Sequence, residues 1–209
     1  MNLFINFVLA NPEIGIAWLL LVVFSICCHE FCHAWTAVRC GDDTPLVTGH
    51  LTLNPLRQMG IMSIIMLLVA GFAWGAVPVN PFKLGSRRNR ILTALAGPGC
   101  NFALFVIFLI LLTAACRFQW PERAVMVFQI GAVLNCALAM LNVLPVPPLD
   151  GFAVLRELCP GVGNPRGEWL KGIMIFMLLA LFTFSHLIFE FSSWITAAAA
   201  GVLLKGMGA

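Results

Sequence analysis

The sequence predicts an all-α polytopic membrane protein, a bundle of transmembrane helices in a single domain covering residues 1–209. Hydrophobic residues make up 61% of the chain and charged residues only 10%, whereas a typical soluble domain is about one-quarter charged. The charges gather in short stretches, and the uncharged runs between them are long enough to cross a hydrocarbon core, which takes about 20 residues. The net charge of +3 is too small to indicate a nucleic-acid surface.

The first core helix is expected from about Ile14 to Cys40. The tripeptide 11–13, Asn-Pro-Glu, is typical of a helix start, because an amide can cap the first turn and proline fits its geometry. Gly41 can take the positive φ found at helix C-termini, and the two aspartates after it mark a polar exit from the membrane. The N-terminus lacks the charged region and cleavage site of a signal peptide, so this helix is expected to remain in the protein.

Two irregular segments are expected after this helix. From Thr44 to Asn54, β-branched residues and leucines flank Gly49, which predicts a short β-hairpin. Residues 59–79 are apolar but are interrupted by glycines and by Pro78, so their path relative to the membrane does not follow from composition.

Three further runs are apolar enough to span the membrane. Ile91 to Ala115 and Ala124 to Leu144 are separated by only a short connection, so they should form an antiparallel pair. A polar segment from Pro145 to Lys171 leads to the run from Gly172 to Leu204, which is long enough for one tilted helix or a broken one. The cysteines lie mostly within or beside apolar runs and are interpreted as reduced packing residues.

His29, Glu30 and His33 form an H-E-x-x-H motif near the end of the first helix. At this spacing the two imidazoles share one face of a helix and can bind one metal ion, while the glutamate is placed to take a proton from water at that metal. The alternative is a pair of structural histidines. The apolar setting favours the metal site, because unpaired ionisable groups in a membrane cost several kcal/mol.

Asp150 is the candidate for the third metal ligand, since catalytic zinc sites usually have three protein ligands and one open position. It ends the segment 142–151, whose prolines prevent a regular helix and free backbone groups at membrane depth. Such backbone is tolerated only where it is buried in protein or lines a wet cavity. The alternative is that Asp150 and Gly151 form an ordinary turn at a membrane exit.

Several segments together resemble the site-2 protease family of intramembrane zinc metalloproteases, in its minimal bacterial form without an inserted PDZ or CBS domain. They are HEFCH (29–33), GHLTLNP (49–55), PVNP (78–81), AGPGCN (96–101) and NVLPVPPLDG (142–151), in the family's order. The chain departs from the family pattern at Gln58, where a histidine is common. It also departs at Cys32, which stands in place of a smaller residue and is interpreted as a packing residue.

The resemblance implies one Zn²⁺ per chain, held by His29, His33 and Asp150, with Glu30 as the general base. It further implies that Asn142 helps to hold the substrate or the oxyanion. The expected substrates are transmembrane segments of membrane proteins, cleaved near the cytosolic face. Such a chain is membrane-embedded and has no nucleic-acid partner, and a homo-oligomer is left open.

The topology follows from the shared metal. His33 and Asp150 each lie near the C-terminal end of a membrane segment, so the two segments should run in the same direction. Two segments that run in the same direction need an odd number of membrane crossings between them. The span 91–115 supplies one crossing, so residues 59–79 should not add a second and should be re-entrant, dipping into the membrane and returning. One side then carries most of the cations: Arg39, Arg57, Lys83, Arg87, Arg88, Arg90, Arg156, Arg166 and Lys171. By the positive-inside rule, that side is the cytosolic face of the cell (inner) membrane, and the active site lies towards it.

A membrane protein that binds or transports metal without proteolysis is the main alternative. It predicts further ligands along more than one helix, and only His186 and Glu190 remain for such a path; this pair is either a second polar patch or a structural hydrogen bond. A membrane di-iron oxygenase needs more than the 4 histidines present. A catalytically inactive scaffold is opposed by the intact Glu30.

Overall fold

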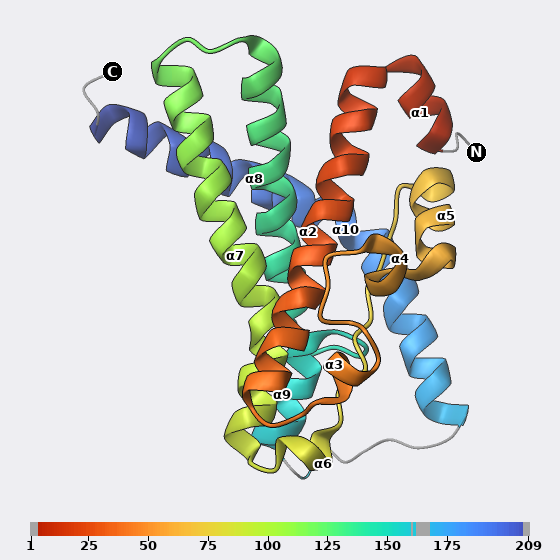
Figure 1. The fold of residues 1–209 in the computed structure, drawn as a ribbon. Helices are drawn as coiled ribbons and strands as arrows, with labels where there is room; N and C mark the ends of the chain where they lie inside the picture. The colour runs from red at the N-terminus through yellow and green to blue at the C-terminus, as the bar shows by residue number, and fades with distance from the viewer. Residues whose placement is uncertain (1–3, 160, 162–167, 207–209) are drawn as a thin grey trace.

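The computed structural model describes residues 4–159, 161 and 168–206, and within these residues the chain is a bundle of helices without a strand (Figure 1). Among the described residues, four helices are long and apolar enough to cross a membrane: Pro12–Arg39, Arg87–Arg117, Glu122–Val143 and Ser185–Gly206. They correspond to α2, α7, α8 and the C-terminal part of α10, which as a whole covers Glu168–Gly206. The expected bundle of membrane-length helices is therefore present.

Helix α2 lies at the centre of the fold, between the short N-terminal α1 (Phe4–Ala10) and the pair formed by α7 and α8. Its apolar residues Leu21, Val22 and Ile26 are buried in one core cluster with Leu134 of α8. Proline at the start and Glu13 in the first turn fit the expected N-terminus, although the Asn11 side chain makes no capping hydrogen bond.

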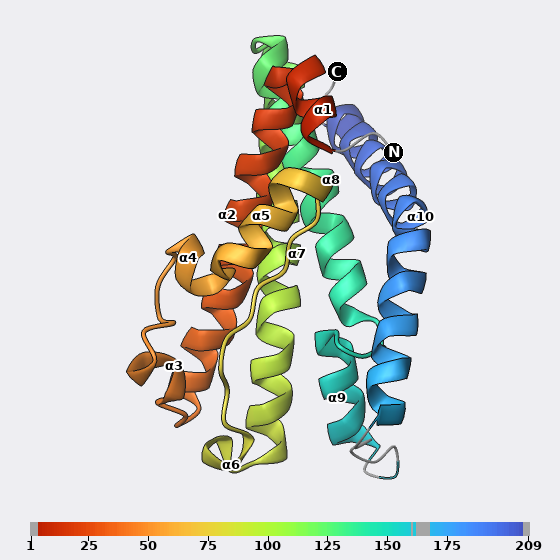
Figure 2. The same cartoon turned by 90° about the vertical axis from the view of Figure 1, so that its right-hand side faces the viewer.

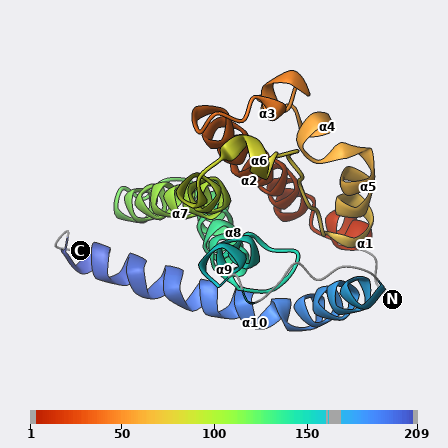
Figure 3. The same ribbon diagram turned by 90° about the horizontal axis from the view of Figure 1, so that it is seen from below.

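Helices α7 and α8 form the antiparallel pair that the sequence predicts, joined by a short connection at one end of the bundle (Figure 1). Helix α9 (Asp150–Leu158) follows α8 and packs against both helices of this pair. Helix α10 is one continuous, curved helix, which decides between the two possibilities for residues 172–204 (Figure 2). Seen along the bundle, α10 lies beside α7 and α8, away from α3, α4 and α5 (Figure 3).

The predicted β-hairpin from Thr44 to Asn54 is wrong. Residues Thr44–Val47 form the short helix α3, and Pro55–Gln58 form α4 (Figure 1). A helical turn is favoured over a strand here because Pro45 fits the start of a helix and the Thr48 N–H donates to the Thr44 carbonyl over 3.0 Å. Gly49 does take a positive φ of 74°, but it ends this turn instead of joining two strands.

Helix α5 (Gly60–Ala70) has 11 residues, so it is much shorter than a membrane span. It ends at Gly71, which has a left-handed φ of 72°, and the chain then runs back in an extended form to α6 (Pro81–Leu84) (Figure 2). The Ser63 hydroxyl fastens this return, because its Oγ donates to the Trp74 carbonyl over 2.7 Å and accepts from the Trp74 N–H over 2.8 Å. Between α4 and α6 the described chain therefore contains one short apolar helix and an extended return, and no helix of membrane-spanning length.

Asp42 holds the end of this return against the end of α2. The side chain is fully buried, not exposed as expected for a polar exit, and its two oxygens accept from the Thr44 N–H at 3.0 Å and the Asn80 N–H at 2.6 Å. Burial by itself would raise the pKa of the Asp42 carboxyl, but these hydrogen bonds and the charge of Lys83 hold that pKa below its usual value. Asp42 is therefore a structural carboxylate.

Asp42→Ala should lower the free energy of unfolding by about 1–3 kcal/mol, because it leaves backbone donors of Thr44 and Asn80 without a partner. Asp43→Ala is the matched control: Asp43 is 60% exposed and pairs with Lys83, and such a surface pair is worth about 0–1 kcal/mol. The Asp42 contribution is present at neutral pH and is lost as the pH falls through the lowered pKa. Thermal unfolding in detergent at pH 7 tests this, and equal effects of both substitutions would contradict it.

Candidate metal centre

Helix α2 places the H-E-x-x-H residues in the interior of the bundle. His29, Glu30 and His33 are 7%, 8% and 8% exposed. One helical turn separates the two histidines, and their rings meet edge to face with centroids 4.6 Å apart. Their Nε2 atoms lie 3.0 Å from each other, so both rings direct the same nitrogen at one point.

Asp150 reaches that point from a distant part of the sequence. It is the first residue of α9, and its Oδ2 lies 3.1 Å from His29 Nε2 and 3.3 Å from His33 Nε2. Gly151 permits this approach, because a Cβ there would lie 2.1 Å from the Val143 carbonyl oxygen at the end of α8.

The other ring nitrogen of each histidine is also held. His33 Nδ1 lies 2.7 Å from the Thr93 carbonyl oxygen of α7, which can only accept, so Nδ1 is the donor. In a neutral ring this leaves the lone pair of His33 on Nε2, directed at the Asp150 carboxylate. His29 Nδ1 lies 2.6 Å from Asn101 Oδ1.

The three side chains fit a zinc ion. One donor atom from each of His29, His33 and Asp150 lies within 4.8 Å of the others, and no other such group of histidine, cysteine or acidic residues occurs in the described part of the chain. Ligands about 2.0–2.1 Å from a tetrahedral zinc are roughly 3.3 Å apart, close to the separations of 3.0, 3.1 and 3.3 Å found here. Three acceptor atoms this close require a cation or shared protons between them.

Two glycines let neighbouring backbone approach the centre closely. A Cβ on Gly97 of α7 would lie 2.2 Å from His33 Nε2 and 2.5 Å from His29 Nε2. A Cβ on Gly75, in the extended segment after α5, would lie 2.3 Å from Glu30 Cγ and 2.4 Å from Glu30 Oε1. Any larger residue at either position would occupy the space in which these side chains act.

A cavity of about 340 Å³ opens beside the cluster. Glu30, His33 and Asp150 line it together with residues of the extended segment and of α7 and α9. An ion pair crosses its lining between α7 and α9, with Arg90 Nε 2.9 Å from Glu157 Oε1. The general-base candidate and two proposed ligands thus face one space that is large enough for part of a peptide.

Other residues singled out in the sequence lie elsewhere. Asn142 Nδ2 donates to the Leu138 carbonyl of its own helix over 3.0 Å, and Asn142 is not among the cavity-lining residues, so its role with substrate stays a prediction. Gln58 Nε2 donates to the carbonyls of His50 and Thr52, so this residue ties down the loop before α4. His186 is exposed and lies 2.9 Å from the Thr183 carbonyl.

Sequence reasoning missed the residues that hold the two histidines. Thr93 acts through its backbone carbonyl, so its side chain carries no signal in the sequence. Asn101 belongs to the segment AGPGCN, which supports the family resemblance, but nothing local to that segment shows that its amide faces His29. Gly97 lies in the same segment, and the atoms that it admits are the imidazole nitrogens of the centre.

Comparison with known proteins finds one matching family model and several similar proteins. The model of the family "Peptidase family M50" matches residues 17–120 and 119–185. The putative zinc metalloprotease YwhC of Bacillus subtilis is 36% identical over 147 residues, which cover 66% of this chain and 67% of that protein. The putative zinc metalloprotease Rip2 of Mycobacterium tuberculosis is 40% identical over 166 residues, covering 74% of this chain and 62% of that protein.

The Rip2 protein of Mycolicibacterium smegmatis is 36% identical over 172 residues, which cover 76% of this chain and 64% of that protein. The chain thus spans about two thirds of the length of these curated relatives. No solved structure shows significant similarity to it.

Gly97→Ala should remove most of the bound zinc, because the added methyl group would overlap both Nε2 atoms. Gly99→Ala is the matched control, since it lies on the same helix and a Cβ there would meet nothing within 4 Å. Alanine also favours a helix over glycine by up to about 1 kcal/mol, so the control should fold at least as well as the natural protein. Zinc content of the purified variants decides the matter, and full zinc in Gly97→Ala would contradict the site.

Proposed function

The chain belongs to peptidase family M50, a family of site-2 protease-like zinc metalloproteases, and on this premise we propose that it hydrolyses peptide bonds in or near the transmembrane helices of other proteins. The proposed zinc ligands are His29, His33 and Asp150. One observation carries the proposal: Asp150 lies beside His29 and His33, although His33 is 117 residues earlier in the chain. Glu30 lines the cavity next to these three side chains.

Glu30 is the proposed general base. When bound, zinc lowers the pKa of a coordinated water to about 7 and polarises a substrate carbonyl. Glu30 adjoins His29 in the chain, lines the cavity and is 8% exposed, so it can take a proton from water in a space with little competing solvent. It would then donate that proton to the amine that leaves when the peptide bond breaks. Gly75 keeps the space around its carboxylate open.

The extended segment 72–80 is the proposed platform for the substrate. On one edge, the N–H groups of Trp74 and Ala76 bond to Ser63 Oγ and to the Gln58 carbonyl. In an extended chain, alternate residues direct their backbone groups to opposite sides. Gly75, Val77 and Val79 line the cavity, as Ala76 also does, and within the described residues the backbone groups of these three make no hydrogen bond.

A peptide must leave its helical form before its carbonyls become accessible, because a helix engages them in backbone hydrogen bonds. Addition of an extended peptide to the edge at residues 75–79 would satisfy the freed groups and place a carbonyl beside Glu30. The apolar side chains on this segment suit residues taken from a transmembrane helix.

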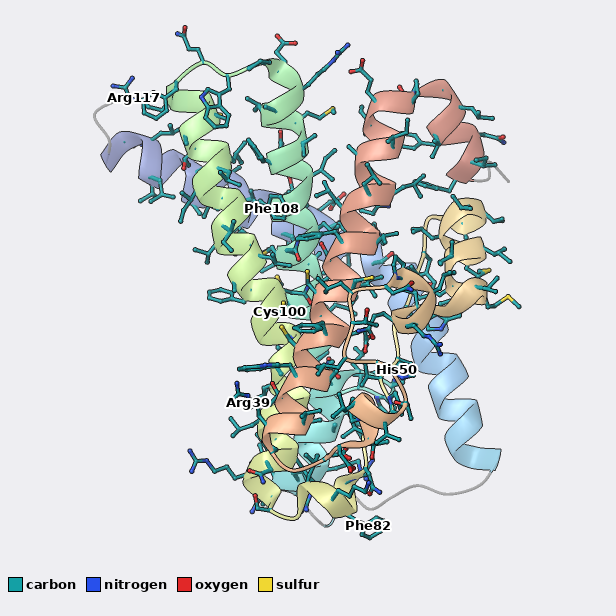
Figure 4. The ribbon with its side chains drawn as sticks, in the orientation of Figure 1. Arg39, His50, Phe82, Cys100, Phe108 and Arg117 are labelled. Carbon is teal, nitrogen blue, oxygen red and sulfur yellow. The ribbon has the colours of Figure 1, made fainter. Side chains whose placement is uncertain are left out.

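The centre is proposed to lie towards the cytosolic side of the cell membrane. Arg39 and Arg117, labelled in Figure 4, lie towards opposite ends of the bundle, and the end near Arg39 also holds Lys83 and the start of α7 with Arg87, Arg88 and Arg90. The other end has Arg117, Arg123 and Lys205. The positive-inside rule assigns the richer end to the cytosol. Of the cations counted in the sequence, Arg166 and the side chain of Lys171 lie outside the described residues.

Reporter fusions test this orientation. A fusion at Arg88, at the start of α7, should report a cytosolic position, and a fusion at Gln119, after the end of α7, should report an external one. The physical reason is that α7 is long enough to cross the membrane once between these two positions. The reverse result, or the same side for both fusions, would overturn the orientation.

Glu30→Gln should keep zinc and lose turnover, because the amide preserves the size of the side chain but cannot accept a proton. General-base catalysis is commonly worth roughly 10²–10⁴-fold, and a loss of this order is expected in cleavage of transmembrane peptides in detergent. Glu190→Gln is the control, since Glu190 is exposed on α10. Near-normal cleavage by Glu30→Gln would remove the proposed mechanism, and loss of zinc would make Glu30 a ligand.

A further inference from the structure

Two fully buried amides connect the metal centre with the middle of the bundle. Asn101 of α7 and Asn135 of α8 are both 0% exposed. Asn101 Oδ1 lies 2.6 Å from His29 Nδ1, and Asn101 Nδ2 lies 3.0 Å from Asn135 Oδ1. An amide buried among apolar helices costs free energy unless it is hydrogen-bonded, so these bonds are strongly favoured. We refer to Asn101 and Asn135 as the amide relay.

The direction of each hydrogen bond in the relay follows from one backbone carbonyl. The Asn135 amide has one end 2.9 Å from the Gly131 carbonyl oxygen, which can only accept. That end must therefore be Nδ2, which also lies 2.9 Å from Ser25 Oγ, a group able to donate or accept. Asn135 Oδ1 is thus the end that faces Asn101, and it can only accept from Asn101 Nδ2.

This direction determines which nitrogen of His29 carries the proton. Because Asn101 Nδ2 is engaged by Asn135, Asn101 presents its oxygen to His29, and His29 Nδ1 must donate. The lone pair of a neutral His29 is then on Nε2, which faces Asp150 Oδ2 at 3.1 Å. A reversed Asn101 amide would donate to Nδ1 and leave the proton on Nε2, in the position that a metal ion needs.

We propose that Asn135 is a positioning residue for the metal centre, which keeps His29 in its metal-binding tautomer by orienting the Asn101 amide. This inference rests on the proposed zinc site and deepens it. The two ends of an amide have nearly the same shape, so the pocket around Asn101 cannot orient it by packing alone. His33 needs no such relay, because the Thr93 carbonyl fixes its tautomer directly.

Asn135→Leu tests the relay, because leucine fills a similar volume but leaves the Asn101 amide free to turn. Loss of an outer partner of a metal-bound histidine commonly weakens metal binding by roughly 10–100-fold, and a loss in this range is expected. The measurement is competition for zinc between the purified protein in detergent and a chelator at pH 7. Thr113→Val is the control: Thr113 is also buried in α7, but among the described residues its hydroxyl bonds only to carbonyls of its own helix.

The decisive variant adds Asn101→Asp to Asn135→Leu. A carboxylate presents an oxygen to His29 Nδ1 in either orientation, so it needs no partner to orient it. Zinc affinity should return to within a few-fold of the natural protein. A purely structural role of Asn135 predicts no such rescue, because the second substitution restores no packing and removes another amide.

Two results would overturn the proposal. One is an Asn135→Leu protein that binds zinc as tightly as Thr113→Val, and the other is a folded double variant that remains as weak as Asn135→Leu. If neither variant folds, imidazole ¹⁵N shifts of the natural protein after zinc removal still test the proposal. They should show the proton of neutral His29 on Nδ1, and a proton on Nε2 would overturn it. Failure of the proposed function itself is distinguishable, because the natural protein would then bind no zinc or cleave no substrate.

Discussion

The need to pair the buried imidazole and carboxylate groups of the centre governs the arrangement of the helices around it. The hydrocarbon region of a membrane contains no water, so an imidazole or carboxylate within it needs a partner inside the protein. The two histidines of α2 meet this requirement on both sides of their rings. Their Nδ1 atoms face Thr93 and Asn101 of α7, and their Nε2 atoms face Asp150. The positions of α7 and α9 around α2 follow from these contacts as much as from apolar packing.

Close approach is the second condition for the centre. Backbone of α7 and of the extended segment lies so near His29, His33 and Glu30 that only glycine fits at positions 97 and 75. Gly151 lets α9 begin against the end of α8. Small residues serve helix packing in membranes because they let backbones approach each other. Here the same property leaves the space in which His29, His33 and Glu30 lie.

Residues 42–80 show how tertiary contacts override local patterns. The β-branched residues at 44–54 predicted strands, but an isolated hairpin is marginally stable, and no sheet in the described part of the chain is there to pair with it. The segment folds into short helices and turns instead. The segment is fixed by Asp42 and Gln58. Asp42 binds the Asn80 N–H, while Gln58 bonds to His50 and Thr52 through its side chain and to Ala76 through its carbonyl. Gln58 therefore has a structural role at the position where a histidine is common.

The sequence by itself determined the membrane class, the spans and the pairing of His29 with His33, because hydrophobic run length and helical periodicity are local properties of the chain. It also indicated Asp150, because irregular backbone with prolines and an acidic residue are tolerated at membrane depth only where protein or a wet cavity surrounds them. Only the tertiary structure decided what surrounds the centre: the Thr93 carbonyl, the Asn101 amide, and the extended segment after α5. The physical reason is that a backbone carbonyl has no sequence signature, and the direction of a buried amide is set by groups on other helices.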